Sequence, residues 1–271
     1  MIDPCTLIFL HIPKAAGITV EAVLREQYSK KAYYRLNISS EMKERSHDDP
    51  GSFLRDPTYL QQLEQLSPAY LRRLQVLSGH VCHGVHRYLP SKARYLVFLR
   101  NPLDRLLSEF SYLRQTGFLA EDMSLSRYVF ERHWVDNLQT RMLSADDGLM
   151  EGIPFGGCDE RHLSVARSRI DDTVNLVGLL EHFDISLLLM QKQLGWKRIS
   201  YVPQNVTRVR VDKVEISSEL RAFILEHNRL DAELHAAAES LLLQRVKERF
   251  RPGEVEQRLG DLERRNRRLA Q

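Results

Sequence analysis

The chain has 271 residues, enough to bury the core of one large domain or at most two. Lysine and arginine number 39 and aspartate and glutamate 36, so the net charge of +3 is too balanced to indicate general binding to nucleic acids or membranes. No apolar run approaches the roughly 20 residues that a membrane-spanning helix needs.

The N-terminal half is predicted to alternate strands with helices. Short apolar runs indicate buried strands, and leucines at helical spacing indicate helices. Ser67 and Pro68 interrupt one leucine-rich stretch and are typical of a new helix start. The expected order is a strand at 5–11, a helix at 18–28, a polar loop at 37–57, two short helices within 58–74, and strands at 75–78 and 93–99.

The C-terminal half continues the alternation up to about residue 250. Because strands alternate with helices, we predict an α/β fold with a central, mostly parallel sheet flanked by helices, in one domain over residues 1–250. The expected elements are helices at 103–115, 124–131, 134–143 and 161–170, a loop at 144–160, a strand at 174–178, a helix at 181–194, a strand at 199–202 and two helical pieces within 217–249.

Residues 251–271 form a separate helical segment in this prediction. Val255, Leu259, Leu262, Asn266 and Leu269 follow the 4-3-4-3 spacing of a coiled coil with one polar core position. Two heptads are marginally stable alone. The segment is therefore either a frayed helical tail or a helix through which the protein forms a homodimer.

The first loop, residues 11–19, has the pattern of an anion-binding turn between a strand and a helix. Backbone N–H groups and a helix N-terminus converge in such a turn and favour an anion. Lysine precedes glycine here, so the Gly-x-x-x-x-Gly-Lys-Ser/Thr pattern of nucleotide-binding P-loops is absent. The candidate anion-binding residues of this loop are Lys14, Ala15, Ala16, Gly17, Ile18 and Thr19.

A second candidate phosphate site begins where the strand at 93–99 ends. Arg100 follows that strand, and its guanidinium can hold a phosphate with two hydrogen bonds. Asn101, Arg105 and Ser108 fall on one face of the helix that follows. The carboxyl ends of parallel strands meet at one edge of a sheet, so we expect Arg100 and the first loop to share a crevice.

Together the two segments resemble the sulfotransferase superfamily. Residues 11–19 are similar to its 5′-phosphosulfate loop, His-Ile-Pro-Lys-Thr-Gly/Ala-Gly-Thr-Ser/Thr, and residues 100–108 to its 3′-phosphate segment, Arg-Asp-Pro-x-x-Arg-x-x-Ser. The pattern is nearest to the heparan sulfate 2-O- and 6-O-sulfotransferases and their bacterial counterparts. The resemblance implies a P-loop-like sulfotransferase fold, 3′-phosphoadenosine 5′-phosphosulfate (PAPS) as sulfate donor, 3′-phosphoadenosine 5′-phosphate (PAP) as product, and no metal.

The resemblance also implies roles for single residues. Lys14 would contact the oxygen between sulfate and the leaving phosphate, and Arg100 and Ser108 would bind the 3′-phosphate. Asn205 and Thr207 lie in a polar segment that either closes over the donor or forms an ordinary loop.

Histidine 80 matches the Gly-His-Val segment that carries the catalytic base of the 2-O enzymes. A base near pKa 6.5 suits removal of a proton from an acceptor hydroxyl. A metal site with His83 and His86, or a structural role, is the alternative for His80. His83 lines the acceptor cleft or the surface, and Gln139 and Arg141 either face the acceptor or buttress the site.

Two residues depart from the family pattern. Ala15 and Ile18 replace hydroxyl residues that donate to the 5′-phosphate. Each lost charge-assisted hydrogen bond is worth about 1.5–3 kcal/mol at most. The loop must therefore rely on its backbone amides, Lys14 and Thr19.

The sequence thus predicts a sulfotransferase acting on an acceptor hydroxyl, most plausibly that of a glycan. A P-loop-type kinase and a non-catalytic nucleotide- or glycan-binding module are the alternatives. Three scattered cysteines and an N-terminus without a basic leader favour a reducing compartment, so we expect a cytoplasmic protein with no membrane span.

Overall fold

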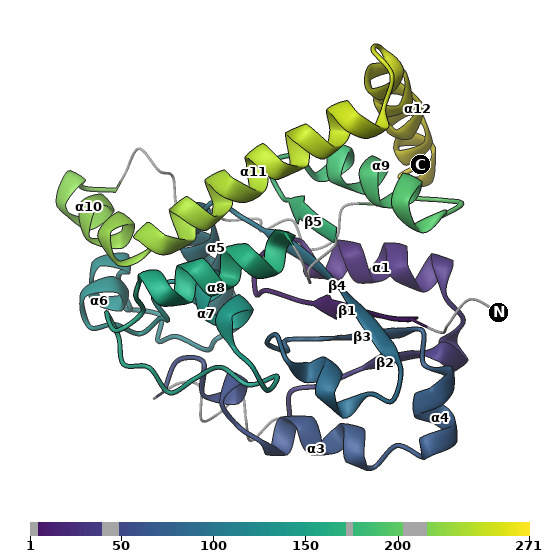
Figure 1. Cartoon of the computed structure of the whole chain (residues 1–271). Coiled ribbons are helices and arrows are strands. Elements are labelled where there is room, and N and C mark those ends of the chain that lie inside the picture. Colours follow the sequence, from purple (N-terminus) through teal and green to yellow (C-terminus); the bar gives the residue numbers. More distant parts are fainter. Residues whose placement is uncertain (1–4, 40–48, 172–175, 203–215) are drawn as a thin grey trace.

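A computed structural model describes residues 5–39, 49–171, 176–202 and 216–271. Its centre is a sheet of five parallel strands in the order β2-β3-β1-β4-β5, with helices packed around it (Figure 1). The α/β prediction with a parallel sheet is confirmed. The strands are β1 (Cys5–Leu10), β2 (Tyr33–Arg35), β3 (Val76–Gly79), β4 (Lys92–Leu99) and β5 (Leu176–Leu179).

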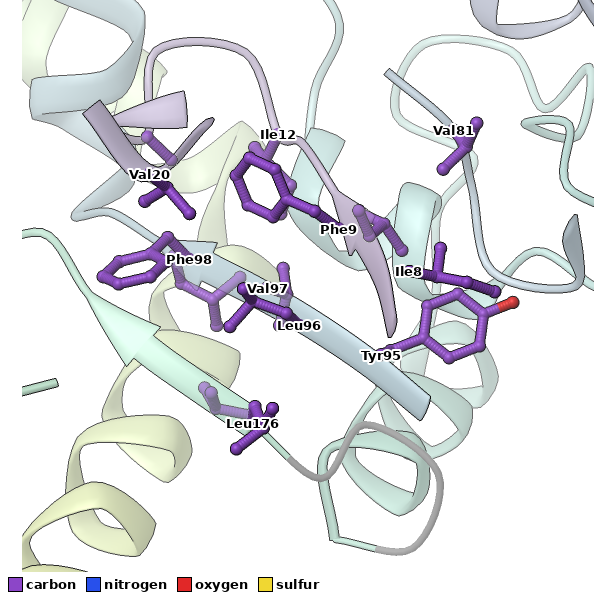
Figure 2. Close-up of a cluster of buried hydrophobic side chains, with 14 of the residues drawn as sticks. Ile8, Phe9, Ile12, Val20, Val81, Tyr95, Leu96, Val97, Phe98 and Leu176 are labelled. Atoms are coloured by element: carbon purple, nitrogen blue, oxygen red, sulfur yellow. The ribbon is translucent and has the colours of Figure 1, made fainter. Parts of the chain in front are cut away.

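The central strands β1 and β4 form the core of the molecule. Strands of a parallel sheet are covered on both faces, and for this reason they carry continuous apolar runs. Figure 2 shows Ile8 and Phe9 of β1 packed beside the side chains of β4, from Tyr95 to Phe98, with Leu176 of β5 on the other side. Five of the six residues of β1 are buried.

Two strand predictions differ from the structure. The edge strand β2 was missed because it has only three residues and pairs with β3 alone. Residues 199–202 do not form a strand. The N–H of Tyr201 donates to the side-chain Oδ1 of Asn266 at 2.9 Å, so it is not available for a strand partner.

The helices otherwise lie near their predicted places. The helix predicted from residue 134 begins at Leu138, because Asn137 has a left-handed backbone with φ of 45°. The helices are α1 (Gly17–Gln27), α3 (Thr58–Glu64), α4 (Pro68–Arg73), α5 (Pro102–Gln115), α6 (Leu125–Phe130), α7 (Leu138–Ser144), α8 (Glu160–Asp171), α9 (Phe183–Leu194), α10 (Ser218–His227), α11 (Arg229–Arg249) and α12 (Glu254–Leu269).

The C-terminal helix α12 packs against α9, at the far end of the long helix α11 (Figure 1). Leu262 is fully buried, and Val255 and Leu259 are partly buried against the same core. Leu269 is 56% exposed. Most of the apolar stripe that suggested a homodimer therefore packs against the core of the same chain. None of the helices in the described ranges has the length and apolar character to cross a bilayer.

We expect replacement of Leu262 by alanine to destabilise the protein, because it leaves a cavity between α12 and α9. Leucine-to-alanine changes at buried positions cost about 2–5 kcal/mol. Leu269→Ala on the same helix is the control and should change the free energy of unfolding by less than about 0.5 kcal/mol. Urea denaturation measures both. Equal, small effects would contradict the packing of α12 described above.

Candidate functional site

The register of β1 and β3 brings two histidines together. Leu10 is aligned with Gly79, so the residues that follow them, His11 and His80, are neighbours beyond the carboxyl ends of the strands. Their rings lie 4.3 Å apart. The N–H of His11 donates to the carbonyl of Gly79 at 3.0 Å, which continues the pairing past the last strand residue.

A cavity of about 1140 Å³ opens at this edge of the sheet. Its lining residues come from many segments of the chain and form three groups, which we call the loop wall, the strand wall and the helix wall. The loop wall contains Lys14, Gly17, Ile18, Arg100, Phe183 and Tyr201; the strand wall contains Arg35, Leu36, Asn37, Ile38, Phe53 and His80; and the helix wall contains Ser108, Glu109, Tyr112, Thr116, Tyr128 and Trp134.

The backbone of the first loop is arranged for an anion. Lys14 and Ala16 have left-handed backbones, with φ of 68° and 63°, which is uncommon for residues other than glycine. Ala16 precedes α1 and has no side-chain oxygen to cap the helix. Gly17 and Ile18 of the first turn line the cavity. The backbone N–H groups of this turn can therefore donate hydrogen bonds to a ligand.

Ala15 does not take part in this cradle. Its side chain is 1% exposed and absent from the cavity lining, and its amide donates to the carbonyl of Ile12 at 3.3 Å. Ala15, predicted among the anion-binding residues, therefore turns away from the cavity in this structure. Ile18 is 44% exposed at the cavity, and Ala16 and Thr19 also line it.

Gly17 is required because of His11. A Cβ atom at Gly17 would lie 1.6 Å from Nε2 of His11, which is 5% exposed. The His11 ring is confined on its other sides by Phe9, stacked at 5.3 Å, and by the Glu21 carboxylate, 3.5 Å from Nδ1. His11 thus supports the loop from below.

Glu21 links α1 to three strands. Its carboxylate accepts hydrogen bonds from Nε of Arg35 at 3.0 Å and from the hydroxyl of Ser78 at 3.3 Å, besides its contact with His11. Burial by itself raises the pKa of Glu21, but His11, Arg35 and Arg25 together lower it below its usual value. A charged carboxylate therefore anchors the helix beneath the cavity.

His80 is held in the form that a general base requires. Its Nδ1 lies 2.7 Å from the carbonyl oxygen of His11, which can only accept, so Nδ1 carries the proton and Nε2 is free to accept one. The N–H of His80 donates to the hydroxyl of Tyr59 at 3.0 Å. Burial, followed by the His11 charge, lowers the pKa of His80 well below 6.5, so it is neutral at pH 7.

Lys14 brings a positive charge to the same cavity. Its ammonium lies 4.0 Å from the centre of the Tyr112 ring. Burial lowers the pKa of Lys14 to about 8; Glu109 opposes this shift, whereas Arg100 and Arg105 add to it. At neutral pH Lys14 is therefore mostly protonated but readily gives up its proton.

A chain of hydrogen bonds fixes Arg100. Its Nη1 donates to the carbonyl of Lys14 at 2.9 Å. The Gln139 amide donates to the Arg100 carbonyl and accepts from its N–H, both at 2.9 Å. The buried carboxylate of Asp231 in turn accepts the N–H groups of Gln139 and Thr140 at the start of α7.

Of the two roles predicted for Gln139, its contacts fit the one in which it buttresses the site. It is fully buried and absent from the cavity lining, because both ends of its amide are engaged by Arg100. Ser108 lies at the cavity as predicted. Arg105, predicted on the same helix face, is fully buried and pairs with Glu109 at 3.0 Å, so it does not line the cavity.

His83 and Arg141, predicted as candidate acceptor contacts, lie away from the cavity lining in this structure. His83 is 6% exposed and stacks on Tyr95 at 4.7 Å, away from the cavity lining. Arg141 is 2% exposed, pairs with Asp136 at 2.7 Å and donates to the carbonyl of Ile153 at 2.8 Å. The described ranges contain no group of three or more acidic, histidine or cysteine residues arranged to hold a metal.

Asn205 and Thr207, predicted to close over the donor, lie outside the described residues. The structure adds cavity residues that the sequence prediction missed. Glu109 and Tyr112 follow Ser108 on α5 by one and four residues, and the four-residue spacing of Tyr112 was a usable signal. Phe53 and Tyr201 come from irregular segments, where no periodic signal exists.

Replacement of Gly17 by alanine should destabilise the protein, because the added methyl group overlaps the confined ring of His11. Overpacking at such sites costs about 1–3 kcal/mol. Gly260→Ala in α12 is the control: its Cβ meets only an arginine side chain at 3.4 Å, and alanine favours the helix by about 0.5–1 kcal/mol. Urea denaturation compares the two. Unchanged stability of Gly17→Ala would mean that His11 is free to move away.

Comparisons with known proteins identify the family of the chain. The model of the galactose-3-O-sulfotransferase family matches residues 3–271. Galactose-3-O-sulfotransferase 2 of Sus scrofa is 24% identical over 203 residues, or 70% of this chain and 49% of the relative, so the chain spans about half the length of that curated relative. A crystal structure of a sulfotransferase from Alicyclobacillus acidocaldarius has 16% identity and a TM-score of 0.45, with 88% of this chain and 96% of that chain covered.

The matching family differs from the heparan sulfate enzymes to which the motifs were compared. The match supports the resemblance at the level of sulfotransferases and does not show heparan sulfate specificity. The chain belongs to the galactose-3-O-sulfotransferase family.

Proposed function

We propose that this protein transfers the sulfuryl group of PAPS to the 3-hydroxyl of a galactose unit in a glycan. The observation that carries the proposal is the convergence of Lys14, His80, Arg100 and Ser108 on one cavity, at the carboxyl ends of parallel strands. The family match supports the reaction class, and the name of the pig relative supports galactose as the acceptor.

The loop wall, together with Ser108 of the helix wall, fits the donor. The first-turn amides of α1 and Lys14 suit the 5′-phosphosulfate, and Arg100 with Ser108 suits the 3′-phosphate. Phe183 and Tyr201, whose rings are 5.0 Å apart, offer an aromatic surface for a purine. Asn266 and Asp184 hold Tyr201 in place through its N–H and its hydroxyl, at 2.9 and 2.8 Å.

The reaction needs one proton to move and one bond to be exchanged. Nε2 of His80 takes the proton of the acceptor hydroxyl as the acceptor oxygen forms its bond to sulfur. The bond from sulfur to the bridging phosphate oxygen breaks, and PAP leaves with the negative charge. The ammonium of Lys14 and the loop amides stabilise this charge in a partly buried site, where such interactions are strong.

Sulfate transfer from labelled PAPS to a panel of galactosides, glucosides and heparan sulfate oligosaccharides tests the proposal, with mass spectrometry to locate one added sulfate. We expect sulfated galactosides. Lys14→Ala and His80→Ala should each lower kcat by about 100-fold or more, whereas Lys197→Ala at an exposed lysine should have no effect. If His80→Ala turns over like the wild type, His80 is not the base. If the wild-type protein transfers sulfate to none of the acceptors, the proposal is wrong.

The pH dependence of kcat/KM should be bell-shaped. Below the lowered pKa of His80 the imidazole is protonated and cannot act as a base, so the acid limb lies below the usual histidine range. Above about pH 8 Lys14 loses its proton and its charge, so activity falls. Lys14→Arg keeps a permanent charge and should move the alkaline limb to higher pH. An alkaline limb unchanged in Lys14→Arg would assign that limb to another group.

A further inference from the structure

The position of the acceptor follows from the fixed orientation of His80. Because Nδ1 is bound to the carbonyl of His11, only Nε2 can receive a proton from the cavity. A general base works within hydrogen-bond reach of the proton that it removes, about 2.6–3.2 Å between heavy atoms. The sugar ring that bears the reacting hydroxyl must therefore lie next to His80.

Phe53 is the aromatic side chain that lies there. Its ring centre is 5.8 Å from that of His80, and the two ring planes meet at 70°, so the edge of one ring contacts the face of the other. Phe53 lines the cavity and is only partly buried, whereas the next residue, Leu54, is 1% exposed and belongs to the core. Phe53 also packs against the core, and its remaining exposed part lines the cavity, where a ligand can reach it.

The segment that carries Phe53 is held rigidly. Gly51 adopts φ of 74° and starts a short 3₁₀ turn over Ser52–Leu54. The carbonyl of Leu54 accepts the N–H of Met150 at 2.6 Å, and Arg55 pairs with Asp49 across the turn. A preorganised ring binds a ligand without the entropy cost of being ordered first.

We propose that Phe53 is the platform on which the acceptor galactose packs, and that it selects galactosides over glucosides. This inference rests on the proposed function. In galactose the axial 4-hydroxyl leaves the C–H groups of C3, C4 and C5 together on the opposite face, which forms one apolar surface. The equatorial 3-hydroxyl projects sideways from a sugar packed on Phe53, and His80 is the neighbouring ring that would receive its proton.

Selection follows from the difference between the two sugars. In glucose the 4-hydroxyl is equatorial, so neither face gathers these three C–H groups. Apolar surface packed against an aromatic ring is stabilising, and a polar group buried there without a partner is costly. The strand wall adds a polar edge for the other hydroxyls, because Asn37 and Arg35 also line the cavity.

Binding of methyl β-galactoside and methyl β-glucoside to the PAP-saturated protein tests the inference without turnover, by calorimetry or ligand-observed NMR. Phe53→Ala should weaken galactoside binding at least tenfold and abolish the preference over the glucoside, with unchanged affinity for PAP. Phe53→Trp should retain both binding and preference. Phe130→Ala, which truncates a 42% exposed phenylalanine on α6, is the matched control and should bind like the wild type.

Steady-state kinetics and the melting temperature distinguish a loss of acceptor binding from a loss of folding. The acceptor KM should rise in Phe53→Ala while the KM for PAPS and the melting temperature stay near wild type. If Phe53→Ala misfolds, Phe53→Leu keeps apolar bulk without an aromatic face and should lose the preference for galactoside. Unchanged affinity and preference in the active Phe53 variants would overturn this inference alone, whereas a wild type that sulfates no sugar would defeat the proposed function itself.

Discussion

The hydrogen bond between the carbonyl of His11 and Nδ1 of His80 is the contact on which the geometry of the site depends. It spans 2.7 Å between the ends of β1 and β3 and determines which ring nitrogen faces the cavity. The same His11 supports the first loop through its close packing on Gly17. One residue thus sets the positions of both the anion cradle and the proposed base, because parallel strands end at a common edge.

Residues far from the cavity hold its other polar groups. Asp231 on α11 anchors the start of α7, and Gln139 on that helix clamps the backbone of Arg100. Asn266 on α12 holds Tyr201, another residue of the cavity lining. Helices from the last third of the chain therefore determine the geometry of a site whose motifs lie in the first 110 residues, since a preorganised site needs its side chains fixed before the ligand arrives.

The sequence predicted much of the fold and part of the site. Long apolar runs such as residues 5–11 identified central strands, and a glycine-bearing turn after one of them identified the anion loop. The three-residue strand β2 was missed, because so short a segment has no periodicity to detect. Whether His83, Gln139 and Arg141 face an acceptor was left open by the sequence, and the structure shows all three buried and engaged within the protein.

By itself the sequence determined the parallel α/β class, the anion loop with Lys14, and the partnership of that loop with Arg100 and Ser108, because these depend on local pattern and on the order of strands. Only the tertiary structure decided that Ala15 and Arg105 turn away from the cavity, that Asn266 holds Tyr201, and that Phe53 stands beside His80. Such contacts join residues widely separated in the chain, and no local preference encodes which side chain a distant backbone will bring within reach.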